Sequence, residues 1–416
     1  MDTYRWYAGL DWASQSHRVQ VLDAAGRKLE EFDLAHSNRG IEELLNRLDA
    51  LTGGDLSQLA VAIEVPRGAL VEALVERGAH VYAINPKQLD RFRDRYSPAG
   101  AKDDSRDAFV LGDSLRTDRH CFRRVEPDAP EVIALREASR IDEELGEALG
   151  QFSNRLREQL NRYWPELLGL CPAADEPWLW ALLARAPEPS AGQRLTRAAV
   201  AAVLKEKRIR RLSAADVLGA FRAPALPVAP GTVDAAAAHV SLLVEQLTLL
   251  RRQRQSNENR LRSLLERLQA DEATPAGKCA DVEVLRSLPG VGIRVAGALL
   301  GEASQALAQR DYQALRSHAG LAPITRQSGK SRRVMMRRAC NTRLRNAVYH
   351  WARVSAQRDP HSKARYSALR RKGHSHARAL RSLADRLLAQ LMAMLRHGSP
   401  YEPNRARRAP AGAVAA

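Results

Sequence analysis

The chain has few aromatic residues and few cysteines, and it lacks a continuous apolar run of about 20 residues. Aromatic side chains make up only 5% of its 416 residues, so we expect cores built from leucine, valine and alanine. The four cysteines lie far apart, without metal-site spacing, which predicts free thiols in a reducing compartment. The first residues lack the basic-then-apolar pattern of a secretion signal. We therefore expect a cytoplasmic protein that does not interact with a membrane.

Positive charge is what the chain has in excess. The formal net charge is +17, and the isoelectric point is about 10.2. Such a balance predicts a polyanionic partner, most simply nucleic acid. Hydrophobic residues make up 45% of the chain, which is ordinary for a protein with buried cores, and the length predicts two or three domains.

The first third of the chain has the pattern of an α/β domain. The three earliest strands are joined by short links, which favours an antiparallel meander. A nearly continuous apolar run at 59–65 is typical of a buried parallel strand. We predict strands at 4–12, 18–24, 28–34, 59–65 and 79–84, with helices at 38–51 and 69–77 and further helical segments after them. This order predicts an RNase H-like fold.

Four acidic residues occupy the places where such a fold carries its chemistry. Asp104 and Asp107 are three residues apart at the start of a predicted helix, so they share one helical face. Asp11 and Glu64 end the first and fourth predicted strands. Four oxygen donors of this kind suit one or two Mg²⁺ or Mn²⁺ ions. The alternative is that Asp104 and Asp107 only cap a helix and favour its N-terminal dipole.

The middle of the chain is predicted to be helical. A long helix is expected at 131–164, followed at 166–231 by an Ala- and Pro-rich segment of short helices and loops that reads as an insertion. A heptad predicts a coiled-coil helix at 236–269, with Arg254 and Asn257 on its stripe beside Val240, Leu243, Leu247, Leu250, Leu261, Leu264 and Leu268. This helix can pair with 131–164 in the same chain or with its copy in another chain, and we favour a role in oligomerisation.

These segments predict a division of the chain into domains. A linker is expected at 271–280, and the Pro-, Arg- and Ala-rich end of the chain is expected to be disordered. The predicted parts are an RNase H-like (RuvC-like) domain at 1–128, a helical coiled-coil region at 129–275, a mainly α domain at 276–398 and a tail at 399–416.

Two motifs in the C-terminal part predict contact with nucleic acid. The run from Leu288 to Gly292 resembles a helix-hairpin-helix element, in which backbone N–H groups around Gly290 and Gly292 hold a phosphate. An ordinary helix corner is the alternative. Farther on, the basic run at 326–345 contains no acid and carries the predicted phosphate contacts Arg326, Lys330, Arg332, Arg333, Arg337 and Arg338. A run of charged residues is usually a solvated face of the protein. A run that contains only positive charges instead favours binding to a polyanion.

Ser328 lies within this basic stretch, between Gln327 and Gly329. Neighbouring cations would stabilise charge on a phosphorane and could activate the hydroxyl as a nucleophile. From the residues alone this signal is weak, because most loop serines cap or solvate turns. Ser331 is a rival, whereas Tyr349 and Tyr366 are expected to pack in helices.

Taken together, the motifs resemble one family. The chain is similar to the DEDD transposases of the bridge-RNA-guided insertion-sequence family, which combine a RuvC-like domain with a C-terminal serine transposase domain. The resemblance covers nearly the whole chain and depends on the order and distances of its blocks. These are Gly9-Leu10-Asp11, Ala62-Ile63-Glu64, Asn85-Pro86, Lys102 to Ala108, Leu288 to Gly292, Gly320 to Pro323 and Gln327 to Lys330.

The resemblance implies a mechanism. Asp11, Glu64, Asp104 and Asp107 would bind the divalent metal, and Ser328 would attack a phosphodiester to form a covalent phosphoserine–DNA intermediate. Strand exchange would follow without net hydrolysis. The acids and the serine would act as a composite site between subunits of a dimer or tetramer. A structured noncoding guide RNA would pair with the double-stranded donor and target DNA.

Two positions depart from the family pattern. Asp103 stands where the family has threonine, so it could compete with Asp104 as the third acid, and Gln327 replaces the first of a doubled serine, which leaves Ser328 as the clearer nucleophile. Two other functions stay open on the sequence. One is a metal-dependent, RuvC-like, structure-specific endonuclease without a covalent intermediate. The other is a non-catalytic nucleic-acid-binding or assembly protein.

Overall fold

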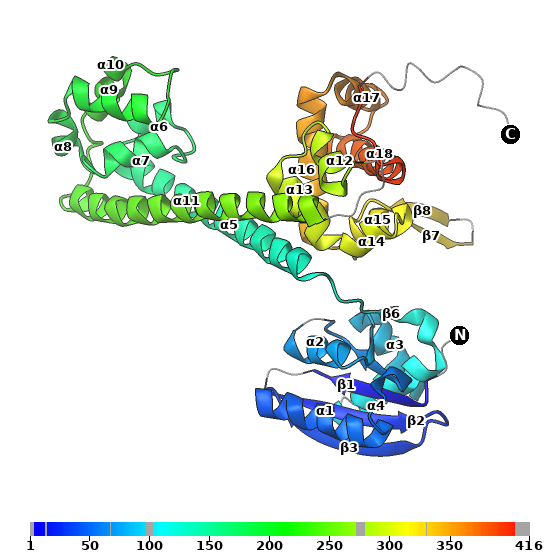
Figure 1. Cartoon of the computed structure of the whole chain (residues 1–416). Helices are drawn as coiled ribbons and strands as arrows, with labels where there is room; N and C mark the ends of the chain where they lie inside the picture. Colours follow the sequence, from blue (N-terminus) through cyan, green and yellow to red (C-terminus); the bar gives the residue numbers. More distant parts are fainter. Residues whose placement is uncertain are drawn as a thin grey trace, which may run out of the picture. The chain divides into compact units, whose positions relative to one another are not determined.

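The computed structural model describes residues 4–12, 15–66, 68–96, 103–271, 279–329 and 331–403. The chain divides into two compact units, residues 1–128 and 129–416, which are described separately (Figure 1).

The first unit is built on a six-stranded mixed sheet with the strand order β3-β2-β1-β4-β5-β6. Strands β1, β2 and β3 pair antiparallel, whereas β1, β4 and β5 pair parallel. The meander and the buried parallel strand predicted from the sequence are confirmed, and the sheet fits an RNase H-like domain. Only the short edge strand β6 was missed. The strands are β1 (Trp6–Asp11), β2 (Ser16–Asp23), β3 (Lys28–Ala35), β4 (Leu59–Ile63), β5 (His80–Ala83) and β6 (Arg123–Arg124).

Helices cover both faces of this sheet because its central strands bury side chains on both sides. Val61 and Ile63 of β4 face a core shared with α1 and α2, whereas Ala60 and Ala62 face a core shared with α3 and α4. Ser37 caps the first helix by accepting a hydrogen bond from the Gly40 amide. The helices are α1 (Asn38–Thr52), α2 (Ala69–Glu76), α3 (Pro86–Tyr96) and α4 (Asp104–Thr117), with short 3₁₀ turns η1 (Leu56–Gln58) and η2 (Arg119–Cys121).

Two long antiparallel helices, α5 (Pro130–Tyr163) and α11 (Thr232–Asp271), form the spine of the second unit (Figure 1). The polar residues on the predicted heptad stripe contact α5: Asn257 Nδ2 donates to the Ala138 carbonyl at 2.8 Å, and Arg254 binds Asp142. The structure therefore realises the intrachain pairing. The seam that we assigned to oligomerisation is covered within one chain.

Helix α11 also contains a stretch long and apolar enough to cross a bilayer by length and composition alone, which was not predicted from the sequence. This signal is weak, since Val240, Leu243 and Leu247 of α11 are buried in a protein core. Its middle carries Arg251 and Arg252, both exposed. One side of α11 therefore packs in a protein core, and its apolar stretch is only weak evidence for a membrane span.

Short helices pack on one end of this pair, as predicted for 166–231. Their core surrounds the buried side chains of Trp164, Trp178 and Phe221. They are α6 (Glu166–Leu170), α7 (Pro177–Leu183), α8 (Pro189–Gln193), α9 (Arg197–Glu206) and α10 (Ala214–Phe221).

The other end of the pair packs against the C-terminal helices, around the buried Trp351. These are α12 (Asp281–Ser287), α13 (Ile293–Glu302), α14 (Ser304–Ala308), α15 (Tyr312–His318), α16 (Thr342–Arg358), α17 (Pro360–Arg371) and α18 (His376–His397). Most of the predicted linker (272–278) and of the predicted tail (404–416) lies outside the described residues. Tyr401, at the start of that tail, donates its amide to Ser287 Oγ at 2.8 Å.

A β-hairpin interrupts these helices. Strands β7 (Ile324–Ser328) and β8 (Ser331–Met335) pair antiparallel across a tight turn, where Gly329 has a φ of 52°. The sequence predicted a loop for this segment, within a mainly α domain. That prediction was wrong in detail: neither face of the hairpin is buried, so its residues lack the apolar–polar alternation that marks a half-buried strand.

Candidate active site

Asp11 and Glu64 lie at the same edge of the sheet. Asp11 is the last residue of β1, and Glu64 directly follows β4. Leu10 and Ile63, the residues before them, are register partners in the parallel pair. Because neighbouring strands lie about 4.8 Å apart, the two acids start from adjacent backbone positions.

Helix α4 brings the other two acids to this edge because it packs unusually close to β1. A Cβ on Gly9 would lie 1.8 Å from the Ala108 carbonyl oxygen and 2.6 Å from the Gly112 amide. Only glycine at position 9 permits this approach. Asp107, next to Ala108, is 1% exposed, and Asp104 lies one turn earlier on the helix.

The four acids act on one another electrostatically. The pKa of Asp11 is raised to about 6, mainly by burial and then by the negative charges of Asp107, Asp104 and Glu64, while the positive charge of Arg93 lowers it. The acids singled out in the sequence thus lie near one edge of the sheet, where hard carboxylate oxygens suit a divalent ion such as Mg²⁺. Among the described residues, no three of these acids have ligand oxygens that all lie within 4.8 Å of one another.

Asp103, the rival for the third position, serves as the N-cap of α4. Its carboxylate accepts a hydrogen bond from the Ser105 amide. Asp104 is already in the first turn of the helix, on the face of Asp107. This arrangement favours Asp104 as the third acid.

Two residues at this edge were missed in the sequence. Arg93, on α3, lies among the acids and binds Asp107 through two hydrogen bonds of 2.6 and 2.8 Å. Glu31, on β3, accepts a hydrogen bond from the Ser105 hydroxyl and so ties the start of α4 to the sheet. Hydrogen bonds from Lys28, Ser105 and Arg18 lower the pKa of Glu31 to about 2. Neither residue belongs to a motif, and no spacing signal marks their partners.

The close packing of Gly9 yields a prediction. Replacement by alanine should destabilise the first unit by about 3 kcal/mol, because α4 must move away from β1. Amide hydrogen exchange of β1 and α4 during urea titration measures this loss. Gly150→Ala is the control: among the described residues nothing lies within 4 Å of its added Cβ, so mid-helix alanine should be neutral or stabilising. Equal protection of β1 and α4 in Gly9→Ala and the parent would refute the packing argument.

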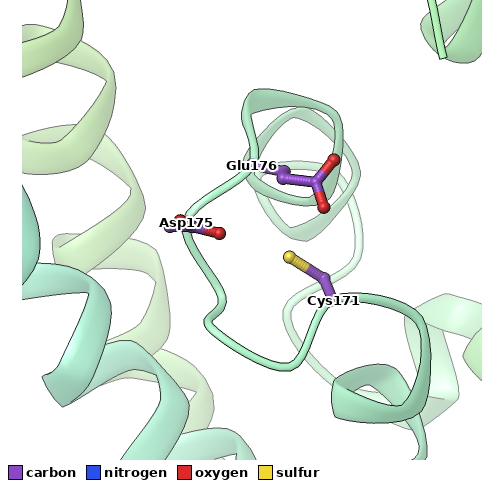
Figure 2. A group of neighbouring side chains, drawn as sticks. All are labelled: Cys171, Asp175 and Glu176. Atoms are coloured by element: carbon purple, nitrogen blue, oxygen red, sulfur yellow. The ribbon is translucent and has the colours of Figure 1, made fainter. Parts of the chain in front are cut away.

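A second group of potential metal ligands lies in the loop between α6 and α7. Among the described residues, Cys171, Asp175 and Glu176 are the one such group whose ligand atoms lie within 4.8 Å of one another (Figure 2). Burial raises the pKa of the Cys171 thiol, which disfavours the thiolate that a metal needs. Glu176 is already bound by Arg211 and by Trp178 Nε1. We therefore interpret this cluster as structural. The described cysteines are free, as predicted.

Ser328 lies at the tip of the β7–β8 hairpin, directly opposite Ser331. Apart from Ile324, every residue of the two strands is exposed. A two-stranded ribbon without a buried face is marginally stable by itself. The cross-strand pair Arg326 and Arg333 adds like-charge repulsion, which a bound polyanion would relieve.

The register of the hairpin sorts its arginines into two faces. Side chains alternate along a strand, and directly paired residues share a face. Ser328, Ser331, Arg326 and Arg333 therefore lie on one face, and Arg332 lies on the other. Lys330 lies outside the described residues, and Arg337 and Arg338 follow the second strand.

The helix corner at Leu288–Gly292 joins α12 to α13 and is held by α16. Trp351 Nε1 and Ser355 Oγ both donate to the Pro289 carbonyl, at 3.0 and 2.6 Å. Gly290 has a φ of 84°, and a Cβ there would lie 2.9 Å from Ser355 Oγ. Gly292 is the N-cap of α13, and among the described residues no atom lies within 4 Å of a Cβ built on it. Gly290 is thus needed for the turn, whereas Gly292 is sterically free.

A cleft of about 840 Å³ adjoins this corner, between α5, α11, α13 and α16. Two of its arginines are paired within the chain: Arg294 binds Asp142 and Glu258, and Arg343 binds Glu143 and Glu144. Arg343 belongs to the basic run noted in the sequence, so part of that run serves the fold. These acids also make the start of α13 less positive than the motif alone implies.

Comparisons with known proteins agree with this geometry. A family model for transposases of the DEDD type of IS110 matches residues 8–165, and a model described as the transposase IS116/IS110/IS902 family matches residues 282–367. The chain is 31% identical to the mini-circle transposase for IS117 of Streptomyces coelicolor over 97% of each chain. It is 30% identical to the 43.6 kDa protein of insertion element IS110 from the same species, over 98% of this chain and 96% of that one.

A stronger but shorter similarity joins the chain to the transposase y4uE of Sinorhizobium fredii. The two are 49% identical over 214 residues, which are 51% of this chain and 60% of the relative. The chain therefore spans less than two thirds of that relative, whereas it spans nearly all of the two Streptomyces proteins.

Proposed function

The chain belongs to the IS110 family of DEDD transposases, enzymes that cut and rejoin DNA, and from this membership we propose how its residues divide the work. Asp11, Glu64, Asp104 and Asp107 hold divalent metal, Mg²⁺ or Mn²⁺, and Ser328 is the nucleophile. The observation that carries the proposal is geometric: paired strands and the close approach of α4 bring the acids to one edge of the sheet, where Arg93 contacts both Glu64 and Asp107.

A divalent ion held by these carboxylates would neutralise charge on the reacting phosphate and lower the pKa of a bound hydroxyl. The protein's own part is to concentrate negative charge there. Asp11 and Glu64 are fixed by paired strands, and Asp107 by the close approach of α4 to Gly9. Rigid elements of this kind hold ligands more precisely than loops do.

The proposed covalent step is a transesterification. Ser328 Oγ forms a bond to phosphorus, one P–O bond to a deoxyribose breaks, the serine proton passes to a base, and the leaving sugar oxygen takes up a proton. Arg326 and Arg333 share the Ser328 face of the hairpin, where they can bind the phosphate and stabilise its developing charge. Attack by the free sugar hydroxyl of another strand reverses these bonds and rejoins DNA without net hydrolysis.

Double-stranded DNA is the substrate, and we assign its contacts to the exposed cations around the hairpin and to the corner at Gly292. The proposal also includes a structured RNA that serves as the guide. The protein acts as an assembly of two or more subunits, and its location is the cytoplasm. The net charge of +17 suits one or both nucleic acids. Purifying the protein with and without the noncoding RNA of its element, and comparing DNA joining, tests the guide.

The Gly292→Asp variant tests whether the corner at Gly292 binds a DNA phosphate or is an ordinary helix corner. The new carboxylate can cap α13 and should leave the melting temperature unchanged or slightly higher. If the α13 N-terminus meets a DNA phosphate, binding should weaken roughly tenfold at moderate salt, measured by fluorescence anisotropy. Gly292→Asn, which caps without charge, should bind as the parent does. Equal binding by Gly292→Asp and Gly292→Asn would exclude this corner from the DNA interface.

The function as a whole is tested by incubating protein, RNA, Mg²⁺ and labelled DNA and resolving the products under denaturing conditions. The proposal predicts a covalent protein–DNA adduct that depends on the metal. Free 3′-hydroxyl and 5′-phosphate ends without an adduct would instead indicate the metal-dependent endonuclease.

A further inference from the structure

Arg93 occupies the centre of the acidic edge. Its Nε and Nη2 atoms donate to the two oxygens of Asp107 at 2.6 and 2.8 Å, and Nη2 lies 3.8 Å from Glu64 Oε1. The third nitrogen, Nη1, binds Asp90. One guanidinium therefore engages two of the four proposed metal ligands at once.

The burial of these groups shows that this is not an ordinary surface ion pair. The Asp107 side chain is 1% exposed, whereas that of Arg93 is 22% exposed and that of Asp90 is 66% exposed. Asp107 would be a buried, unpaired carboxylate without a cation, and such a group is strongly unfavourable. Arg93 supplies that cation from the rim of the site.

The Arg93 guanidinium would oppose the binding of a divalent ion to Asp107 in two ways. Both carboxylate oxygens already accept its hydrogen bonds, and its positive charge would repel an ion bound beside it. The side chain can yield, because Asp90 already holds Nη1 on the solvent side and a DNA phosphate offers the same bidentate chemistry.

We propose that Arg93 is a positioning residue that holds Asp107 in the metal-free protein and competes with the divalent ion for that carboxylate. Metal binding then requires the guanidinium to turn outward, toward Asp90 or toward a phosphate of the DNA. This inference rests on the proposed metal site and adds a residue that sets its affinity.

The test measures Mn²⁺ binding to the full chain without DNA, by titration calorimetry or electron paramagnetic resonance. Arg93→Gln should bind Mn²⁺ roughly tenfold more tightly than the parent, because the competing charge is gone. A residue with only a structural role would give the opposite sign, since damage to the site weakens metal binding. Arg95→Gln is the matched control: it removes the same charge from the same helix, and Arg95 pairs with Asp118.

Metal-free stability supplies a second readout. In EDTA, Arg93→Gln should melt roughly 5 °C below the parent, and Mn²⁺ should raise its melting temperature more than it raises the parent's. If Arg93→Gln fails to fold without metal, the Mn²⁺ affinity of Arg93→Lys tests the competition instead. Lysine keeps the charge but loses the bidentate geometry, so its Mn²⁺ affinity should exceed that of the parent.

The possible outcomes distinguish a failure of the Arg93 inference from a failure of the proposed metal site on which it rests. If Asp11→Asn weakens Mn²⁺ binding but the Arg93 variants bind no more tightly than the parent, the competition is refuted and the metal site stands. If Asp11→Asn and Asp107→Asn leave Mn²⁺ affinity unchanged in both the parent and Arg93→Gln, the metal site itself is wrong and the inference falls with it.

Discussion

Replacing Ser328 with alanine is expected to abolish the covalent protein–DNA adduct and to lower strand joining by about a thousandfold or more, because no other group then forms the bond to phosphorus. DNA affinity should stay within about twofold, since the serine hydroxyl is one small contact beside many arginines. Denaturing gel electrophoresis of labelled DNA measures the adduct, and anisotropy measures affinity.

The hairpin offers a matched control for this result. Ser331 lies directly across from Ser328, on the same exposed face and beside the same arginines. Ser331→Ala changes the same chemistry at the neighbouring position and should keep most of the adduct. If Ser331→Ala loses the adduct and Ser328→Ala retains it, the two serines must be exchanged in the proposal. If both variants retain the covalent adduct, neither hairpin serine is the nucleophile.

The second large effect is expected at the acids. Asp107→Asn should lower DNA cutting by about a hundredfold or more, because the buried carboxylate that we propose as a metal ligand loses its charge. Removing divalent metal with EDTA should give a loss of similar size in the parent, and adding Mg²⁺ or Mn²⁺ back should restore cutting. Asp104→Asn should resemble Asp107→Asn.

Asp103→Asn is the control for this pair. It replaces the carboxylate that caps α4 with an amide that is also a good N-cap, so it should leave cutting nearly unchanged. A severe loss in Asp103→Asn with little loss in Asp104→Asn would make Asp103 the third acid. Full activity in Asp107→Asn would refute a metal site at this edge of the sheet.

Much of the first unit could be predicted from the sequence because its signals are local. Alternating residues mark β2, an apolar run marks β4, and Ser37 marks the start of α1. The acids could be proposed because Asp11 and Glu64 stand at the ends of β1 and β4, and Asp104 and Asp107 at the start of α4. Their convergence follows from the parallel pairing of β1 and β4 and from Gly9, whose lack of a side chain brings α4 close.

Other features depend on contacts that no local pattern encodes. Arg93 meets Asp107 only because α3 and α4 pack on the same face of the sheet. The heptad of α11 predicted a partner helix, but the identity of that partner is settled by ion pairs such as Arg254 with Asp142. The β7–β8 hairpin escaped prediction because neither of its faces is buried, so its apolar and polar residues do not alternate.

The most direct measurement of the central claim is to identify the amino acid that carries the DNA. The adduct formed with Mg²⁺ is digested with protease and nuclease, and the remaining nucleotide-linked peptide is sequenced by mass spectrometry. The proposed mechanism predicts a phosphodiester on Ser328. A linkage to any other residue, or efficient DNA joining with no linked peptide at all, would contradict it.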